Sequence, residues 1–245
     1  MSVVLQTLRR TWSTMKGSLI APTVTQVANI TYFKRPPDYS HVEMPEKSRL
    51  PILPKVPTYQ TGVRIPKMKK GLKHMRGPEM IHNKLIHKQY GIIALTGGRL
   101  KFGHLEMMRN TLGRQIDQKR MFLQWRIDAP WQAVVKRSQG TRMGGGKGNI
   151  HHYVTPVKAH RVIVELAGKC DYEEVERLLS NVAGLLPFKA MAVSQKMLEK
   201  MEAEAIREEE ENQNRYTMKY LIQNNIQNCQ TQMRQIDLSY FGKYV

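Results

Sequence analysis

Four glycines and a lysine lie close together in the segment RMGGGKGNIHH, residues 142–152, just before an apolar run. Glycines allow positive φ and let the backbone approach a ligand closely, so consecutive N–H groups at 144–148 could face phosphate oxygens. Arg142 and Lys147 would place positive charge beside them. A nucleotide, a polynucleotide and a plain hairpin tip with incidental charge would each use some of these residues, so other parts of the chain must distinguish them.

The glycine segment does not have the spacing of a nucleotide-binding loop. A P-loop needs a glycine five residues before its Gly-Lys pair and a serine or threonine after it. The chain has Thr141 and Gly148 at those positions, so the hydroxyl that would hold magnesium is missing. The dinucleotide-binding fingerprint also fails, because the segment runs into a strand and not a helix. These departures favour a polymer backbone over a nucleotide-dependent enzyme.

Few residues have types and spacings suited to catalysis or metal binding. His151 and His152 are adjacent on an expected strand, so their side chains should point to opposite faces and cannot hold one metal together. Cys170 and Cys229 are far apart and have no zinc-site spacing, and no disulfide framework is indicated. Neither a nucleophile elbow nor paired carboxylates are recognisable. We expect no catalytic residue, no metal, no cofactor and no small-molecule substrate.

Positive charge is concentrated in one part of the chain. The 245 residues carry a formal net charge of +19. Residues 61–160 contain twenty lysines and arginines against four acids, which are Glu79, Glu106, Asp117 and Asp128. Ordinary surfaces mix both signs, so this excess favours nucleic acid as partner over an anionic membrane or a merely solvated basic surface. No apolar run approaches the roughly 18 residues of a membrane helix, and no membrane span is expected.

A second group of cations lies upstream of the glycines. The segment PKMKKGLKHMRG, residues 66–77, contains five of them: Lys67, Lys69, Lys70, Lys73 and Arg76. Cations this close repel one another unless an anionic chain runs past them, although a solvated basic loop is the alternative. Residues 36–66 contain seven prolines and few periodic apolar positions, as an extended linker does. We interpret residues 38–87 as a Pro-rich linker and a basic RNA-binding arm.

Residues 88–194 have the pattern of one folded domain. Apolar periodicity predicts strands at 91–95, 120–127, 131–135, 150–157, 160–166 and 188–193. The strands 150–157 and 160–166 should form an antiparallel hairpin through a turn at Lys158-Ala159. Because the strands come in hairpins and do not alternate with helices, we expect an α+β fold: a small two-layer sandwich of a mostly antiparallel sheet and two helices.

Two helices should cover this sheet. The first, at 104–116, has an apolar stripe at helical spacing: Leu105, Met108, Leu112 and Ile116. The second should begin at Asp171, with Glu174 placed as in a capping box, and end at Pro187. The strand 120–127 carries Arg120 and Arg126 on its polar face, which should therefore be cationic. Several aromatic side chains near these cations could stack on bases or pack in the core: Phe122, Trp125, Trp131 and Tyr153.

The two ends of the chain have different compositions. Residues 1–37 contain basic residues, serines and threonines but no acid, as a mitochondrial presequence does, although a nucleic-acid-binding arm or a surface helix could look similar. Residues 195–245 are helix-prone and charged, with an acidic run at 208–211. We expect them to form a charged helical extension that is solvated or binds a partner and is not part of the core.

The order of these elements resembles a known family, bacterial-type ribosomal protein sixteen of the large subunit. Its centre is RMGGGKGNIHHYV, residues 142–154, which is similar to the family's R-M-G-x-G-K-G-N followed by a strand. Other matching segments, in the family order, are GGRL at 97–100, HLEMMRNTLGRQ at 104–115, FLQWRI at 122–127, VIVELAG at 162–168 and LPFKA at 186–190. The resemblance covers about residues 62–194. Gly145 stands where bacterial members commonly carry lysine, which would remove one phosphate contact.

The resemblance implies a structural constituent of the large ribosomal subunit that supports translation and is not an enzyme. It would bind large-subunit rRNA near the tRNA acceptor-site side of the peptidyl transferase region, with a tRNA nearby. The residues that match the family loop are Arg142, Met143, Gly144, Gly146, Lys147, Gly148 and Asn149, and Arg99 matches the family's GRL turn. The five cations of residues 66–77 correspond only loosely to the family's basic arm.

The composition of residues 1–37 suggests the mitochondrial form of this family. We therefore expect the mitochondrial matrix as location, with neighbouring mitochondrial ribosomal proteins as further partners. A mitochondrial RNA chaperone or ribosome assembly factor that leaves the finished particle is the alternative.

Overall fold

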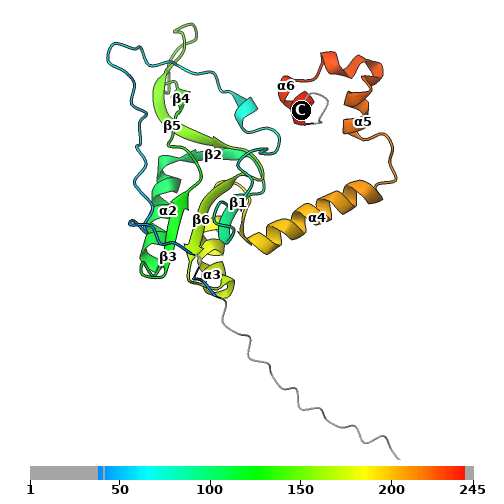
Figure 1. Cartoon of the computed structure of the whole chain (residues 1–245). Helices are drawn as coiled ribbons and strands as arrows, with labels where there is room; N and C mark the ends of the chain where they lie inside the picture. The colour runs from blue at the N-terminus through cyan, green and yellow to red at the C-terminus, as the bar shows by residue number, and fades with distance from the viewer. Residues whose placement is uncertain (1–37, 41, 241–245) are drawn as a thin grey trace, which may run out of the picture. The chain divides into compact units, whose positions relative to one another are not determined.

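Two antiparallel sheets organise the folded part of the chain (Figure 1). The computed structural model describes residues 38–40 and 42–240, so the expected presequence lies outside the described residues. The four-stranded sheet has the order β3 (Met121–Trp125), β6 (Val162–Gly168), β1 (Tyr90–Ala94) and β7 (Ala190–Ser194). The three-stranded sheet has the order β2 (Gly98–Lys101), β5 (Asn149–Val157) and β4 (Gln132–Lys136). The expected α+β fold is confirmed, with a second sheet that the sequence did not predict.

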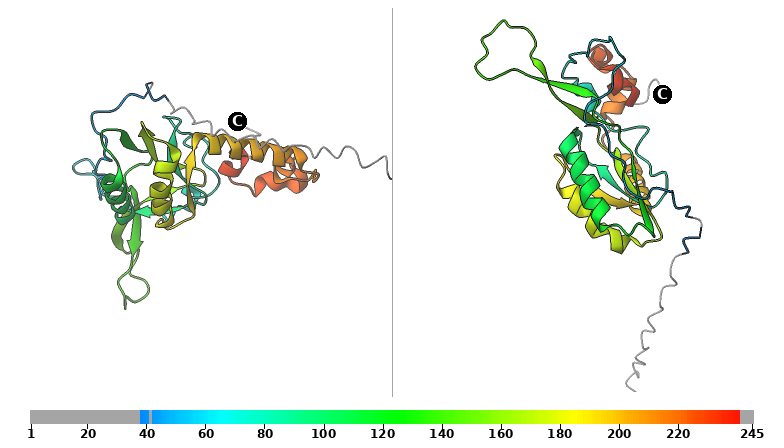
Figure 2. Two further views of the ribbon diagram at one scale, coloured as in Figure 1. Left: turned by 90° about the horizontal axis from the view of Figure 1, so that it is seen from below. Right: turned by 90° about the vertical axis from the view of Figure 1, so that its left-hand side faces the viewer.

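The predicted helices pack against the four-stranded sheet. They are α2 (Phe102–Gln115) and α3 (Tyr172–Gly184), which lie side by side in Figure 2. The predicted stripe of α2 is buried, as are Val175, Leu178, Leu179 and Val182 of α3. These side chains meet the buried residues of the central strands, among them Ile92, Val164 and Leu166, in one hydrophobic core. The periodicity of the apolar residues therefore identified both helices and the faces they bury.

The predicted capping box of α3 is wrong, although Asp171 does occupy the N-cap position. Its side chain makes no capping hydrogen bond. Instead, Asp171 Oδ1 accepts from the hydroxyl of Tyr39 at 2.5 Å, and Glu174 Oε2 lies 3.2 Å from Arg120 Nη2. Partners distant in sequence thus replace the local bonds of the box.

The predicted hairpin between residues 150–157 and 160–166 is also wrong. β5 pairs with β2 and β4, whereas β6 pairs with β1 and β3. Both β5 and β6 are inner strands of their sheets. Because each strand already has a neighbour on both edges, β5 and β6 cannot pair with each other. The turn between them carries the chain from one sheet to the other: His160 has φ 63° and its N–H donates to the Ala94 carbonyl at 2.6 Å.

β4 and β5 form the hairpin that carries the glycines. Their register pairs Gln132 with Val154 and Lys136 with Asn149. Residues 137–148, here called the glycine loop, join the two strands and extend beyond their paired ends (Figure 2). The glycine loop is therefore the end of a two-stranded stem rooted in the three-stranded sheet.

The segment before the domain and the helix after it both contribute to buried clusters. Leu50 is 4% exposed and belongs to the main core. The N–H of Leu123 donates to the Ser48 carbonyl at 2.9 Å, so residues near 48 line the outer edge of β3. Leu198 and Met201 of α4 (Gln195–Glu211) pack on a second buried cluster, formed by Leu85, Ile93, Val162 and Val193.

The expectation that nothing beyond residue 194 joins a core is therefore wrong for the beginning of α4. Short helices follow it: α5 (Met218–Gln223), the 3-10 helix η3 (Ile226–Thr231) and α6 (Gln235–Tyr240). The domain boundaries at 37, 87 and 194 stay predictions.

Candidate nucleic-acid interface

Carboxylates neutralise the arginines that face the four-stranded sheet. Arg126 Nε lies 2.9 Å from Glu165 Oε1, and the Glu165 side chain is 1% exposed. Glu165 also accepts hydrogen bonds from the backbone N–H groups of Ile86 and His87, at 2.9 and 3.3 Å. An ion pair this deeply buried needs both partners, because a single charge left there would lose its solvation without compensation. Arg126 thus belongs to the fold.

The four acids of residues 61–160 also lie beside arginines. The pairs, with their N···O distances, are Glu79–Arg161 at 3.7 Å, Asp128–Arg161 at 3.7 Å, Glu106–Arg109 at 3.9 Å and Asp117–Arg120 at 3.2 Å. The expected cationic face of strand 120–127 is consequently neutralised, since Arg120 and Arg126 both have carboxylate partners. None of these arginines is in the basic arm (residues 66–77) or the glycine loop.

The cations of the basic arm and the glycine loop have no such partners. Among the described residues, no salt bridge involves any of the following side chains: Lys67, Lys69, Lys70, Lys73, Arg76, Lys136, Arg137, Arg142 and Lys147. All of them are exposed. The basic arm, residues 66–77, has little regular secondary structure apart from one short 3-10 helix, η2 (Leu72–His74). Exposed cations without a carboxylate partner are therefore concentrated on the basic arm and the glycine loop, with Lys136 at the base of the loop, although exposed cations elsewhere, such as Lys84 and Arg114, also form no salt bridge within the described residues.

These two segments are bonded to each other, although about 80 residues separate them. Lys147 Nζ donates to the backbone carbonyls of Lys67 and Met68, each at 2.6 Å. In return, Lys67 Nζ lies 3.3 Å from the Lys147 carbonyl and 3.4 Å from Asn149 Oδ1. The structure thus brings together the predicted arm and loop residues, but it also directs Lys147 and Asn149 toward the arm.

The next part of the arm rests on the three-stranded sheet. Arg99 on β2 donates through Nη2 to the Lys70 carbonyl, and Gln132 Nε2 on β4 donates to the same carbonyl at 3.3 Å. Gly71 follows with φ 53°, and a Cβ there would lie 2.9 Å from Gln132 Nε2. The chain needs glycine at this point because the backbone is left-handed and close to a side chain. Arg99, predicted from the family turn, is half-buried and holds the arm.

The tip of the glycine loop is open. Met143 is 97% exposed, and Arg142 beside it is exposed too. Gly144 and Gly146 have φ of 95° and 70°, so both require the freedom of glycine. The Gly146 N–H donates to the Gly144 carbonyl at 2.8 Å, which corrects the expectation that every N–H from 144 to 148 could face phosphate.

The base of the loop is tight. A Cβ on Gly148 would lie 2.7 Å from the Lys136 carbonyl oxygen, so only glycine fits between the two ends of the loop. Arg137 Nη2 donates to the Gly146 carbonyl across the same loop. Gly145, by contrast, has no atom within 4 Å of a Cβ and no positive φ.

The adjacent histidines of β5 do not point to opposite faces. Val134 pairs with His152 and Val135 with Ile150, so His151 is an extra residue in the ladder, a β-bulge. The bulge brings His151 Nδ1 to 2.7 Å from His152 Nδ1. Burial, followed by the charges of His151 and Lys101, lowers the pKa of His152 below its ordinary value.

Three cations near the tip or base of this hairpin were not predicted as interface residues from the sequence. Lys136 and Arg137 line a shallow cavity of about 530 Å³ together with His151. Lys101, at the end of β2, is near enough to His152 to influence its pKa. Their position near the glycines could have been read from the sequence. They were not included because the predicted interface followed the family motif, which begins at Arg142.

The aromatic side chains provide little stacking surface. Phe122 and Tyr153 are buried, at 4% and 8% exposure. Trp125 is half-buried and its Nε1 donates to the Pro51 carbonyl at 2.9 Å. Trp131 packs edge-on against His74 of the arm, with 5.3 Å between ring centroids. These contacts favour structural roles over base stacking.

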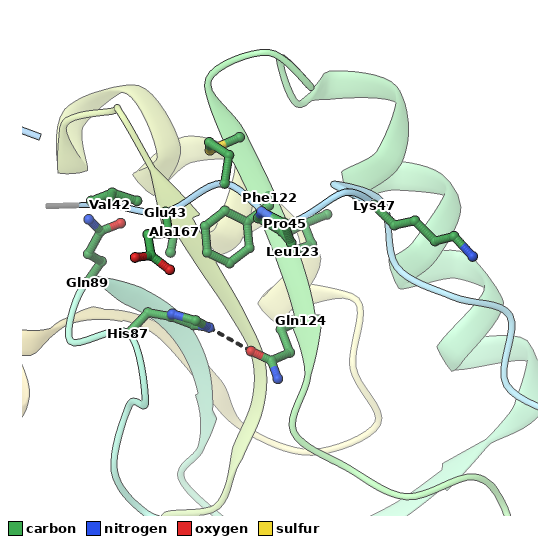
Figure 3. Close-up of a pocket in the computed structure, with 11 residues that line it drawn as sticks. Val42, Glu43, Pro45, Lys47, His87, Gln89, Phe122, Leu123, Gln124 and Ala167 are labelled. Carbon is green, nitrogen blue, oxygen red and sulfur yellow. Dashed lines mark hydrogen bonds between the residues drawn. The ribbon is translucent and has the colours of Figure 1, made fainter. Parts of the chain in front are cut away.

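A larger cavity, of about 560 Å³, lies over β3 and β6 (Figure 3). Its floor includes Phe122, Leu123 and Ala167, and residues 42–47 form one wall. His87 Nε2 and Gln124 Oε1 point toward each other at 2.7 Å, as the dashed line shows (Figure 3). The histidine is thus paired with an amide, and the charged side chains of Glu43 and Lys47 also line the cavity.

Over residues 38–240 without His41, no three His, Cys, Asp or Glu side chains are grouped to hold a metal ion. Within those residues, no helix has both the length and the apolar character needed to cross a bilayer.

Comparison with known proteins identifies a family and similar proteins within it. The family model described as Ribosomal protein L16p/L10e matches residues 61–193, which is more than half of the chain. The large ribosomal subunit protein uL16 of Buchnera aphidicola subsp. Baizongia pistaciae (strain Bp) is 35% identical over 106 residues. That alignment covers 43% of this chain and 75% of the bacterial protein. The family match includes both the basic arm and the glycine loop.

Proposed function

The chain belongs to the ribosomal protein L16p/L10e family, whose members are structural constituents of the large ribosomal subunit, and from this premise we propose how it binds RNA. The basic arm and the glycine loop contact large-subunit rRNA. The residues of this interface are Lys67, Lys69, Lys70, Lys73, Arg76, Arg99, Arg142, Met143, Gly144, Gly146, Lys147, Gly148 and Asn149. The observation that carries the proposal is the convergence of exposed cations without carboxylate partners on these two segments.

The physical basis of binding is counterion release. Lysine and arginine side chains at phosphates displace condensed cations from the RNA, which stabilises the complex at low salt. The open tip of the loop, with Arg142 exposed, can enter between RNA strands because glycines keep it narrow. The protein orders RNA, and peptide-bond chemistry is left to the RNA. The interface lies near the tRNA acceptor-site side of the peptidyl transferase region.

A charge-removal experiment tests the interface. Arg142→Ala should reduce the salt dependence of binding to a large-subunit rRNA fragment by about 0.7 to 0.9 in the slope of log K against log salt, the value for one phosphate contact. Arg120→Ala is the matched control, because its guanidinium is exposed but paired with Asp117 and Glu174. Filter binding between 50 and 200 mM salt, about the range over which such contacts weaken, measures both slopes. Equal slopes for Arg142→Ala and the unmodified chain would exclude the loop tip from the interface.

We further propose that the protein acts in the mitochondrial ribosome. The acid-free composition of residues 1–37 supports this location. Mass spectrometry of the mature amino terminus from purified mitochondria tests it, and recovery of the protein only outside mitochondria contradicts it. Sedimentation separates a resident constituent from an assembly factor, since a resident protein remains with translating ribosomes.

A further inference from the structure

We propose that Lys147 is a positioning residue that fastens the basic arm to the glycine loop, so that both segments meet RNA as one surface. We call the contact between the side chains of Lys67 and Lys147 and the opposing backbone the arm–loop latch. Its existence in the free protein does not depend on RNA. Its consequence for binding rests on the proposed function.

The geometry of Lys147 points to the arm. An ammonium group has three N–H donors. Two of them are accounted for by the carbonyls of Lys67 and Met68, both at 2.6 Å, a short distance typical of charge-assisted hydrogen bonds. Lys147 therefore has at most one donor left for a phosphate.

The latch is reciprocal. Lys67 Nζ reaches the Lys147 carbonyl and Asn149 Oδ1, so each lysine binds the backbone next to the other. Two positively charged segments repel each other when they are brought together without anions. Carbonyl and amide oxygens on both sides offset this repulsion, because their negative ends face the ammonium groups.

A second anchor fixes the arm three residues further on. The Lys70 carbonyl accepts from Arg99 and from Gln132, which belong to β2 and β4. The loop and the sheet bind the arm through its backbone carbonyls at Lys67, Met68 and Lys70, and these bonds do not occupy the side chains of the lysines that follow Met68. The exposed side chains of Lys69, Lys70 and Lys73 are thereby held beside the loop.

Holding the arm in place should strengthen RNA binding without adding a contact. Cations fixed in one geometry lose less conformational freedom on binding than cations on a free segment. If the arm were released, the arm and the loop would bind RNA as two tethered segments and no longer as one multivalent surface. Loss of Lys147 should consequently cost more than one phosphate contact.

Limited trypsin digestion of the full chain without RNA tests the latch. In Lys147→Ala, cleavage after Lys69 and Lys70 should be about five- to tenfold faster, the change expected when a charge-assisted hydrogen bond no longer opposes local opening. Lys147→Arg should restore protection, because a guanidinium can also donate to two carbonyls. Arg142→Ala is the charge-matched control: it removes one cation from the same loop but no bond to the arm, and arm cleavage should stay at the rate of the unmodified chain.

RNA binding provides the second readout. Replacing Lys69 and Lys70 by alanine should reduce the salt slope by about 1.4 to 1.8 in the unmodified chain, but by less than half of that in Lys147→Ala. Unchanged arm cleavage in Lys147→Ala, with thermal unfolding confirming a folded chain, overturns the latch. If cleavage is accelerated but replacing Lys69 and Lys70 reduces the salt slope equally in the unmodified chain and in Lys147→Ala, the contact exists but has no role in binding. Accelerated cleavage with no effect of any of these cations on RNA binding refutes the proposed interface and leaves the contact established.

Discussion

Two groups of cations in this protein have opposite surroundings. The arginines near the four-stranded sheet, such as Arg126 and Arg161, are mostly buried and lie beside carboxylates. The cations of the basic arm and the glycine loop are exposed and contact backbone carbonyls or solvent. Net charge alone does not distinguish the two groups. The difference teaches that a candidate binding surface is better indicated by cations that lack acidic partners and lie on adjoining segments than by the number of cations.

The comparison also separates stability from binding. Removing the carboxylate partner of a buried arginine should destabilise the protein without changing the salt dependence of RNA binding. Changing the loop should alter the response to salt with little effect on unfolding, except where the backbone is tightly packed. The following three substitutions test this separation, beginning with the largest effect.

Glu165→Ala should lower the free energy of unfolding by about 3–5 kcal/mol, because it leaves Arg126 with a buried, unpaired charge. Two backbone N–H groups, of Ile86 and His87, also lose their acceptor. Urea unfolding followed by tryptophan fluorescence measures the change. Glu106→Ala is the control, since its pair with Arg109 is exposed and should contribute less than about 1 kcal/mol. An equal loss of unfolding free energy in the two variants would contradict the expected difference between the buried and the exposed ion pair.

Gly148→Ala should destabilise the hairpin by about 1–3 kcal/mol, because the new Cβ would overlap the backbone at Lys136. Gly145→Ala is the matched control: its Cβ would point into open space, and the reduced freedom of the unfolded chain should raise stability by up to about 1 kcal/mol. Thermal unfolding of both variants provides the measurement. If Gly148→Ala is as stable as Gly145→Ala, the claim that only glycine fits at position 148 is wrong.

Gly145→Lys should have the smallest effect on stability and a measurable effect on binding. It introduces the lysine that bacterial members commonly carry, at a position with free space and an ordinary φ. One added phosphate contact should steepen the salt slope by about 0.7 to 0.9. Filter binding at several salt concentrations detects this change, and a slope equal to that of the unmodified chain would show that position 145 does not reach RNA.

Local patterns in the sequence predicted much of the fold. The stripes of α2 and α3 were readable because helical periodicity directly reports the buried face. The glycine loop was recognised because its residue types and spacing are unusual. The four acids were also identified, and two of their pairs join residues three apart, but the pairing of Glu79 and Asp128 with Arg161 needed the fold.

Features that depend on distant partners were not predictable. The sequence placed β5 and β6 in one hairpin because a short turn joins them, whereas each strand has two other neighbours. The bulge at His151 depends on the register against β4. The bonds between Lys67 and Lys147 join residues 80 positions apart, and no local pattern encodes such a contact.

The backbone near Ser48 also limits where the amino end can be trimmed. The Ser48 carbonyl accepts from Leu123, and the Pro51 carbonyl accepts from the Trp125 indole. A protease that removed residues through Pro51 would leave the Leu123 N–H on the edge of β3 and the Trp125 indole N–H without these acceptors. Cleavage at any site before Tyr39 would leave both acceptors in place and would keep the tyrosine's bond to Asp171.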